Sequence, residues 1–294
     1  EIPQGDWSSD VCSSDLSYLS YNMTTADANN PDGIVPVGRQ FDFIGDVETE
    51  EMILVDGDES LCLGYTGVQC YEDVYVGDMM EYKATLTNIG NTSRDCHIEV
   101  FKLATPASRA GVENPKTADM VWFDEPLLCT EGNVRLVVKK HLQRGEQPDG
   151  TVVEPWADNE DFPGAAFDPA HPEDITFRYR MSDRDVFYLG GVVNGARNIT
   201  LMEDTAKRLM AREFGNMGHV TAVNKVRLYE PCFAGDYLEY HARINKVVGD
   251  KIEVEVRNFK YIDLPENPEF PSSIDVLPEP KLCTIVQFVF ETYK

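Results

Sequence analysis

The same pattern of residues occurs twice in this chain of 294 residues. The string VGDMMEY at 76–82 recurs as AGDYLEY at 234–240, which is 158 positions later (234 minus 76). The same offset pairs Arg39 with Arg197 and many other identical residues, without a gap. A fixed period of this kind indicates a duplicated structural unit. The chain is therefore expected to fold as two similar halves. Positions where the halves differ then indicate residues that could have a role in only one of them.

Charge narrows the classes of partner. The chain has 26 Lys and Arg residues against 51 Asp and Glu residues, which gives a net charge of -25. Nucleic acids and anionic membranes are bound through basic surfaces, so neither is expected as a partner. The sequence also has no apolar run of about 18 residues, the length of a membrane-spanning helix, and no pattern of a secretory signal peptide. We expect a cytoplasmic protein.

The cysteines do not form a recognisable ligand or disulfide pattern. All seven are scattered and no two are spaced as CxxC, and the histidines are equally isolated. In a chain of this size such spacing does not indicate a metal site or a disulfide framework. We expect buried free thiols and no metal.

The boundaries of the halves follow from the repeat. Within residues 1–16, the stretch from Asp6 can be back-translated codon by codon into a common sequencing-library adapter, and we interpret these 16 residues as a non-native segment. The first half then covers 17–144 and the second covers 174–294. The connecting segment 145–173 is rich in Pro, Gly and acidic residues and is expected to be a linker.

Each half shows the same order of periodic patterns. An alternating run predicts a strand at 17–24 and at 175–182. Apolar residues at intervals of three or four then predict a helix over 37–55, with its counterpart beginning near 193. Four further strands are predicted in each half, at 68–74, 79–89, 95–103 and 132–139, and at 224–229, 237–247, 251–261 and 284–291. Pro-rich excursions at 105–126 and 263–280 are expected to be long loops.

One long helix packed on one face of an antiparallel sheet places each half in the α+β class. With about 125 residues in each half, this order is typical of the hot-dog architecture. The prediction is a tandem, or double, hot-dog in which two such units are joined covalently.

Two mismatches inside the repeat suggest one site made from both halves. Glu50, which is one helical turn after Asp46, corresponds to Arg208 in the second half. Conversely, Asn194 at the start of the second helix corresponds to Pro36. The sequence GGVVNGAR at 190–197 indicates a helix start whose free N–H groups favour a developing negative charge. The first half therefore keeps an acid and the second half keeps the helix start.

Several strings in the first half resemble 3-aminobutyryl-CoA and β-alanyl-CoA ammonia lyases. They are GDVETE at 45–50, DGDESLCLGY at 56–65, VYVGDMMEY at 74–82 and GNTSR at 90–94. The string VNGAR at 193–197 is similar to the helix start of the same family. The resemblance covers 18–139 and, more weakly, 177–261. Members of this family are single hot-dog chains of about half this length, so the fusion is a departure.

The resemblance implies reversible loss of ammonia from a 3-aminoacyl-CoA thioester, without a metal or an organic prosthetic group. Glu50 would be the general base, and the N–H groups at Asn194 and Gly195 would polarise the thioester carbonyl. Tyr188 or the Asn194 side chain would orient the substrate, and Asp46 is a further acidic candidate. Candidate cations for the coenzyme A phosphates are Arg94, Lys139, Lys140, Arg197 and Arg208.

The second pseudo-symmetric position should be inactive, because Pro36 and Arg208 are expected to meet there. A homo-oligomer of fused pairs, such as a trimer, is also implied by the resemblance. Two other functions remain open at this stage. One is thioester hydrolysis or enoyl-CoA hydration on the same fold, because fold alone does not determine the reaction. The other is non-catalytic binding of acyl-CoA.

Overall fold

A computed structural model of the chain describes residues 16–28, 30–139, 141, 175–186, 191–264, 270 and 272–292. The suspected adapter segment, apart from Leu16, and the linker 145–173 lie outside the described residues. The first half contains β1 (Leu16–Asn22), α1 (Val37–Asp56), β2 (Leu61–Cys70), β3 (Met79–Ile89), β4 (Ser93–Pro106) and β5 (Met120–Val137). The second contains β6 (Ile175–Arg180), the 3₁₀ turn η2 (Asp183–Asp185), α2 (Gly195–Phe214), β7 (His219–Leu228), β8 (Tyr237–Val248), β9 (Lys251–Asp263) and β10 (Asp275–Glu291).

The repeat is confirmed by the positions of these elements. Helices α1 and α2 begin and end 158 residues apart, as do strands β2 and β7. The register changes only after the Pro-rich excursions. Cys129 and Cys283 make the same contact in each half, because their carbonyl oxygens accept from the amides of Tyr71 and Tyr229. They are 154 residues apart, so the second excursion is four residues shorter than the first.

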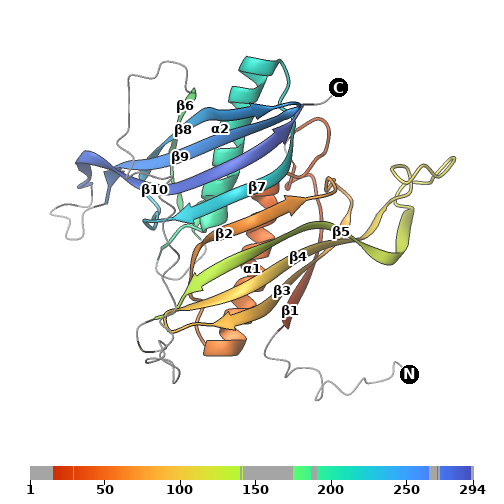
Figure 1. Cartoon of the computed structure of the whole chain (residues 1–294), viewed down its shortest axis with the longest axis horizontal. Helices are drawn as coiled ribbons and strands as arrows, with labels where there is room; N and C mark the ends of the chain where they lie inside the picture. Colours follow the sequence, from red (N-terminus) through yellow and green to blue (C-terminus); the bar gives the residue numbers. More distant parts are fainter. Residues whose placement is uncertain are drawn as a thin grey trace.

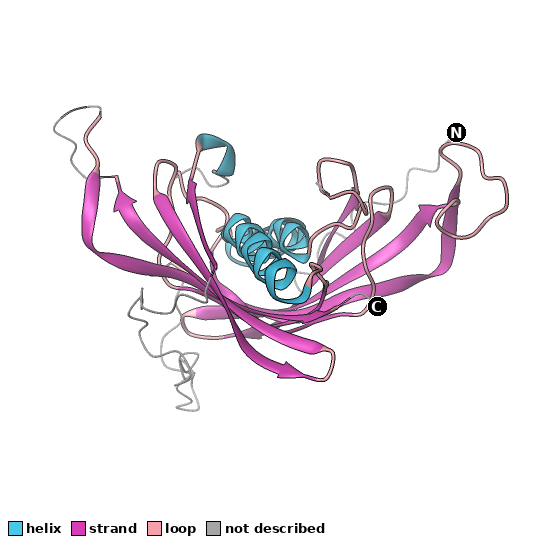
Figure 2. Cartoon of the chain, turned by 90° about the horizontal axis from the view of Figure 1, so that it is seen from above, coloured by secondary structure: helices cyan, strands magenta, loops and turns pink. Residues whose placement is uncertain are grey.

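All ten strands form one continuous antiparallel sheet, in the order β1-β3-β4-β5-β2-β7-β10-β9-β8-β6. The two halves join where β2 pairs with β7 at the centre of the sheet (Figure 1). Both long helices lie side by side in the concave face, and the sheet curves around them (Figure 2). This arrangement confirms the predicted tandem hot-dog fold.

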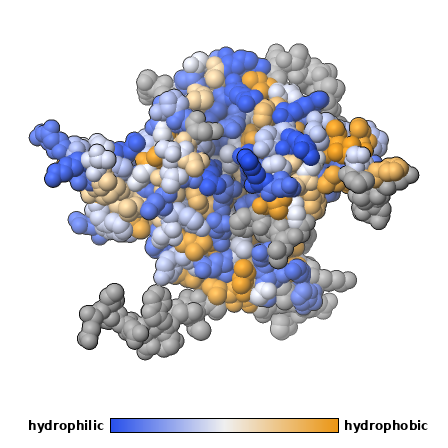
Figure 3. All heavy atoms as spheres, turned by 180° about the vertical axis from the view of Figure 1, so that it is seen from behind, coloured by the Kyte–Doolittle hydropathy of each residue, from blue (hydrophilic) through white to orange (hydrophobic). Residues whose placement is uncertain are grey.

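The helices are held by an apolar stripe on one side and by caps at their ends. Phe41, Ile44, Val47 and Met52 of α1 are all buried, at the spacing expected for one helix face. Both helices end at a glycine in the left-handed conformation, the usual C-terminal cap. Neither helix in the described ranges is both long and apolar enough to span a membrane. The face opposite to that of Figure 1 mixes hydrophilic and apolar residues (Figure 3).

Strands β2 and β7 begin earlier than predicted. The strand predicted at 68–74 overlaps β2 only at 68–70, whereas the strand predicted at 224–229 lies within β7 except for its last residue. In β2, Gly64 and Gly67 interrupt the β-branched pattern on which the prediction depended, since glycine weakens a strand signal. The chain after β2 instead makes a turn that leads into β3.

The Pro-rich excursions are shorter loops than predicted, because β4, β5 and β10 continue into them; in the first excursion, residues 107–119 remain a loop between β4 and β5. The pairing of β5 shifts between Trp122 and Leu127, so Pro126 lies in a bulge between them. In β10 the shift lies between Val276 and Lys281, and two prolines fall inside it. Proline is tolerated at such irregular positions of a sheet because no ladder hydrogen bond is required there.

Two glycines allow the halves to approach closely. A Cβ atom on Gly64 of β2 would overlap the carbonyl oxygen of Val226 in the neighbouring strand β7. A Cβ on Gly38 of α1 would lie 2.6 Å from the Cα of Thr200 in α2. Both obstacles are backbone, which cannot move aside as a flexible side chain can. The close contact of the two halves thus depends on the absence of side chains at these positions.

We expect Gly64→Ala to destabilise the protein by about 1 to 3 kcal/mol, the usual cost of overpacking, because β2 must move away from β7. Gly67→Asn is the matched control: Gly67 lies in the same strand with no atom within 4 Å of its Cβ position, and asparagine tolerates positive φ. Urea unfolding of both variants measures the difference. Equal stability of the two variants would show that this contact does not limit the joint between the halves.

Candidate functional site

A cavity of about 230 Å³ lies between the two halves, next to the start of α2. We call it the seam cavity. Glu48 and Tyr65 line it from the first half, and Asn194, Gly195 and Cys232 line it from the second. The helix start of the second half therefore lies at the boundary between the halves, as expected from the mismatches in the repeat. The acid of the first half that lines the same cavity is Glu48 and not the expected Glu50.

The start of α2 is held in place by hydrogen bonds and has a small residue, Gly195, where it borders the cavity. The Asn194 side chain caps the helix by accepting a hydrogen bond of 3.0 Å from the Ala196 amide. The amide of Val193 donates to the carbonyl oxygen of Cys232, which ties the preceding residues to the next loop. A Cβ on Gly195 would overlap the end of the Leu228 side chain, which would have to move aside. The positive end of the helix dipole faces the cavity.

Glu48 of α1 is a buried carboxyl group that also lines the cavity, with 3% of its surface exposed. Tyr65 donates a hydrogen bond of 2.7 Å to its Oε1, whereas its Oε2 has no partner among the described residues. Burial raises the pKa of Glu48 to about 8. The Cβ position of Gly45 is 4.0 Å from Glu48 Oε1 and 3.6 Å from Asn194 Nδ2, which shows how near the two groups lie.

Helix geometry explains why Glu48 and Glu50 do not share this cavity. Successive residues of an α-helix are about 100° apart, so two residues separate these side chains by about 200°. Glu50 is half-buried and its charge acts on Tyr21 of β1; it is not among the residues that line the seam cavity. The sequence contained one indication that Glu48 could belong to the site: its counterpart in the second half is Ala206, so this position also differs between the halves.

Asp46 takes part in a separate groove on the outer side of the helix pair. It accepts a hydrogen bond of 2.8 Å from the Tyr21 hydroxyl. It lines a cavity of about 490 Å³ together with its counterpart Asp204, with Arg197 and with Asn194. Asn194 therefore borders both this outer groove and the seam cavity.

The candidate phosphate-binding cations are spread over the molecule. Arg94 is fully buried, bonds Asp56 at 2.8 Å and donates to two backbone carbonyls, so it is a structural residue and not a ligand for coenzyme A. Arg197 pairs with Asp185 at 2.7 Å in the outer groove, and Lys139 pairs with Asp58. Arg208 lies over the ring of Phe177, 4.3 Å from its centroid. Lys140 and Tyr188 lie outside the described residues.

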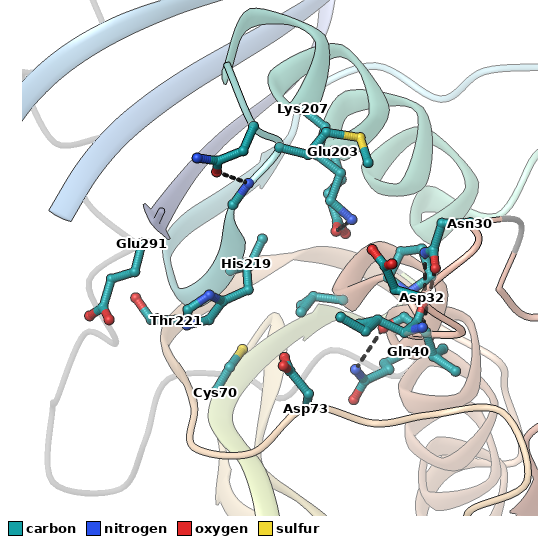
Figure 4. A pocket seen from close by; sticks show the side chains of 18 of the residues that line it. Asn30, Asp32, Gln40, Cys70, Asp73, Glu203, Lys207, His219, Thr221 and Glu291 are labelled. Atoms are coloured by element: carbon teal, nitrogen blue, oxygen red, sulfur yellow. Dashed lines mark hydrogen bonds and ion pairs between the residues drawn. The ribbon is translucent and has the colours of Figure 1, made fainter. Parts of the chain in front are cut away.

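The second pseudo-symmetric position lies at the start of α1, and the residues found there are not all those that were expected. Pro36 lines it, but the cation there is Lys207 and not Arg208 (Figure 4). Glu203 is 1% exposed, accepts a hydrogen bond of 2.6 Å from the Gly38 amide of α1, and pairs with Lys207 at 2.6 Å. The Glu203 carboxylate thus already accepts the hydrogen bond that an N–H group at the start of α1 could otherwise donate to a ligand. The equivalent of Glu203 in the first half is Gly45, which leaves the seam cavity open.

Comparison with known proteins places the first half in a family. No protein-family model matches the chain. The chain is 33% identical to the 3-aminobutyryl-CoA ammonia lyase of Acetoanaerobium sticklandii over 128 residues, which is 98% of that protein and 44% of this chain. The chain belongs to this ammonia lyase family. The chain is therefore about twice as long as this relative, which corresponds to the first half.

Two solved structures complete the comparison. The β-alanyl-CoA:ammonia lyase from Clostridium propionicum is 34% identical, with 46% of this chain and 92% of that chain covered and a TM-score of 0.40. The 12:0-ACP thioesterase from Umbellularia californica matches 95% of this chain and 94% of its own, with a TM-score of 0.59 at 8% identity. At that identity the second match shows the double hot-dog fold alone.

We expect Glu48→Gln to stabilise the protein at pH 8. The folded state raises the pKa of Glu48 from its ordinary 4.5 to about 8, so it binds more protons than the unfolded state between these values. Wild-type stability therefore falls as the pH rises through this window, by roughly 1 kcal/mol for each pH unit, whereas neutral glutamine is unaffected.

Urea unfolding of both proteins at pH 5 and pH 8 measures this effect, and pH 5 provides the internal control because Glu48 is then protonated. A stability difference that is the same at both values would contradict the assignment of Glu48 as a buried, protonated acid.

Proposed function

We propose that this chain is an acyl-CoA-acting hot-dog enzyme that reversibly eliminates ammonia from a 3-aminoacyl-CoA thioester. Family membership supports the reaction class. The observation that carries the proposal is the seam cavity, where a carboxyl group of one half faces a helix start of the other. A volume of about 230 Å³ suits a short acyl chain, since a water molecule occupies about 30 Å³ in the liquid.

Elimination needs a base, a stabilised enolate and a leaving amine. The carboxylate of Glu48 removes the proton from the carbon next to the thioester carbonyl. The electron pair moves onto the carbonyl oxygen, which the N–H groups at Asn194 and Gly195 stabilise. It then returns to form the carbon–carbon double bond as the amine departs. Protonated Glu48 can give its proton to the leaving amine, so the carboxylate is regenerated.

The pKa of Glu48 suits this double role. A group with a pKa of about 8 exists in both forms near neutral pH, and proton transfer is most effective when the pKa lies near the working pH. Because the base must be deprotonated, elimination should accelerate as the pH rises towards 8. By microscopic reversibility, addition of ammonia also begins with the carboxylate, which takes a proton from the adding ammonia, so it should show the same dependence on the ionisation of Glu48.

Glu50 remains the alternative base. It would act from the other side of α1, near Tyr21 and Asp46, and the substrate would then lie in the outer groove instead of the seam cavity. Asn194 borders both spaces, so either position allows it to contact the thioester. The two proposals differ in which carboxylate is required, and each of them can be tested directly. Assembly of the fused pairs into trimers also remains a prediction.

We expect crotonyl-CoA to lose its enoyl absorbance in the presence of the protein and ammonium. Glu48→Gln should lower the turnover number by about 100- to 10,000-fold, the usual contribution of a general base. Glu50→Gln, which makes the same chemical change on another face of the same helix, should retain turnover within about threefold. The opposite result would assign the base to Glu50.

The same assay separates the alternative reactions. Loss of absorbance without ammonium that exceeds one equivalent of the protein would indicate hydration, and release of free thiol would indicate thioester hydrolysis. Binding of crotonyl-CoA without any conversion would favour a non-catalytic acyl-CoA-binding protein.

A further inference from the structure

Two thiols line the seam cavity, one from each half. Cys62 belongs to β2 and Cys232 precedes β8. Neither has a role in the elimination described above. Their surroundings differ, although they border the same space, and this difference allows their chemistry to be compared directly.

Cys232 is surrounded by groups that favour its thiolate. The Asn198 side chain donates a hydrogen bond to its sulfur at 3.4 Å. Asn198 is itself held in place, because its oxygen accepts from Tyr240 at 2.7 Å and from Asn258 at 3.0 Å. A hydrogen bond from Cys283, then the Asn198 amide and the nearby Lys260 ammonium, lower the pKa of Cys232 despite its burial.

Lys260 is kept beside this group by backbone and side-chain contacts. Its ammonium donates to the carbonyl oxygen of Pro231 at 3.1 Å and pairs with Asp236 at 2.8 Å. Pro231 is the residue immediately before Cys232, so the cation is tied to the same loop. Lys260 also pairs with Asp263 at 3.6 Å, so two carboxylates offset its charge, and Asp236 opposes the lowering of the pKa of Cys232. The hydrogen bonds donated to the sulfur are therefore the main groups that favour a thiolate there. The counterpart of Cys232 in the first half is Val74, so the thiol is specific to the second half.

Cys62 has the opposite surroundings. Burial and the nearby Glu48 raise the pKa of Cys62 well above its ordinary value. It therefore stays a neutral thiol, which is a poor nucleophile. Glu48 lines the same cavity, and its Oε2 is buried without a hydrogen-bond partner among the described residues. A ligand that fills the cavity would therefore meet both a carboxyl group and the Cys232 sulfur.

We infer that Cys232 is a covalent attachment site for α,β-unsaturated acyl thioesters, the product class of the proposed reaction. The sulfur would add to the β-carbon, where ammonia adds in the reverse reaction. One carbon–sulfur bond forms, and the double bond's π electrons move to the thioester oxygen beside the start of α2. The Cys232 S–H proton passes to the Glu48 carboxylate as the sulfur adds, and Glu48 then gives a proton to the α-carbon. The net change is addition of S–H across the double bond.

The inference rests on the proposed function for the identity of the acyl group, but its test does not depend on turnover. Wild-type protein is incubated with crotonyl-CoA without ammonium, and separately with N-ethylmaleimide, which reacts with thiols by the same addition and carries no coenzyme A. Intact mass and peptide mapping then locate any adduct. We expect one crotonyl-CoA on Cys232, and modification of Cys232 at least tenfold faster than modification of Cys62 by N-ethylmaleimide.

Matched variants complete the experiment. Cys232→Ser should abolish the crotonyl-CoA adduct, whereas Cys62→Ser should retain it. An adduct on Cys62, or none on Cys232 with either reagent, would overturn the inference. Reaction of Cys232 with N-ethylmaleimide but not with crotonyl-CoA would also overturn it. If the wild type still combined crotonyl-CoA with ammonium in that case, the proposed function would stand; if it did not, both would fall.

Discussion

The pairing of β2 with β7 is the contact on which the rest of the structure depends. It joins two five-stranded sheets into one and brings the two helices together in its concave face. The close approach requires glycine at Gly64 and Gly38, because backbone atoms of the other half occupy the space that a side chain would need. Once this contact is made, the start of each helix must face the other half. Any site at a helix start is therefore shared between the halves.

Covalent fusion allowed the two shared positions to diverge. In a symmetric dimer each residue appears twice, so a change that improves one site alters both. Here Gly45 leaves space beside Asn194 at the seam cavity, whereas its counterpart Glu203 bonds the Gly38 amide and Lys207 at the other position. Likewise Glu48 corresponds to Ala206. The seam cavity thus holds a carboxyl group with an open oxygen, while the other position holds a carboxylate whose partners are already present.

The repeat made most of the fold predictable, because the helices and the inner strands of both halves have the same offset. The predicted strand boundaries were wrong where single residues, such as glycine or proline, gave a misleading local pattern. Glycines in β2 hid a strand, and Pro126 lies in a bulge that cannot be recognised without knowing the partner strand. The site was harder. Glu48 and Glu50 differ by two residues and point in nearly opposite directions, and only the packing of α1 against α2 decides which of them meets Asn194. Such long-range packing is not visible in a local pattern.

Burial connects the groups of the seam cavity with one another. The same apolar surroundings that raise the pKa of Glu48 also suppress ionisation of Cys62, and the charge of Glu48 adds to that effect. At Cys232, hydrogen-bond donors offset the effect of burial. The cavity is thus lined both by a carboxyl group and by a thiol whose thiolate is favoured. The proposed additions to a polarised double bond need this combination, because one atom gains a proton while its neighbour gains a nucleophile.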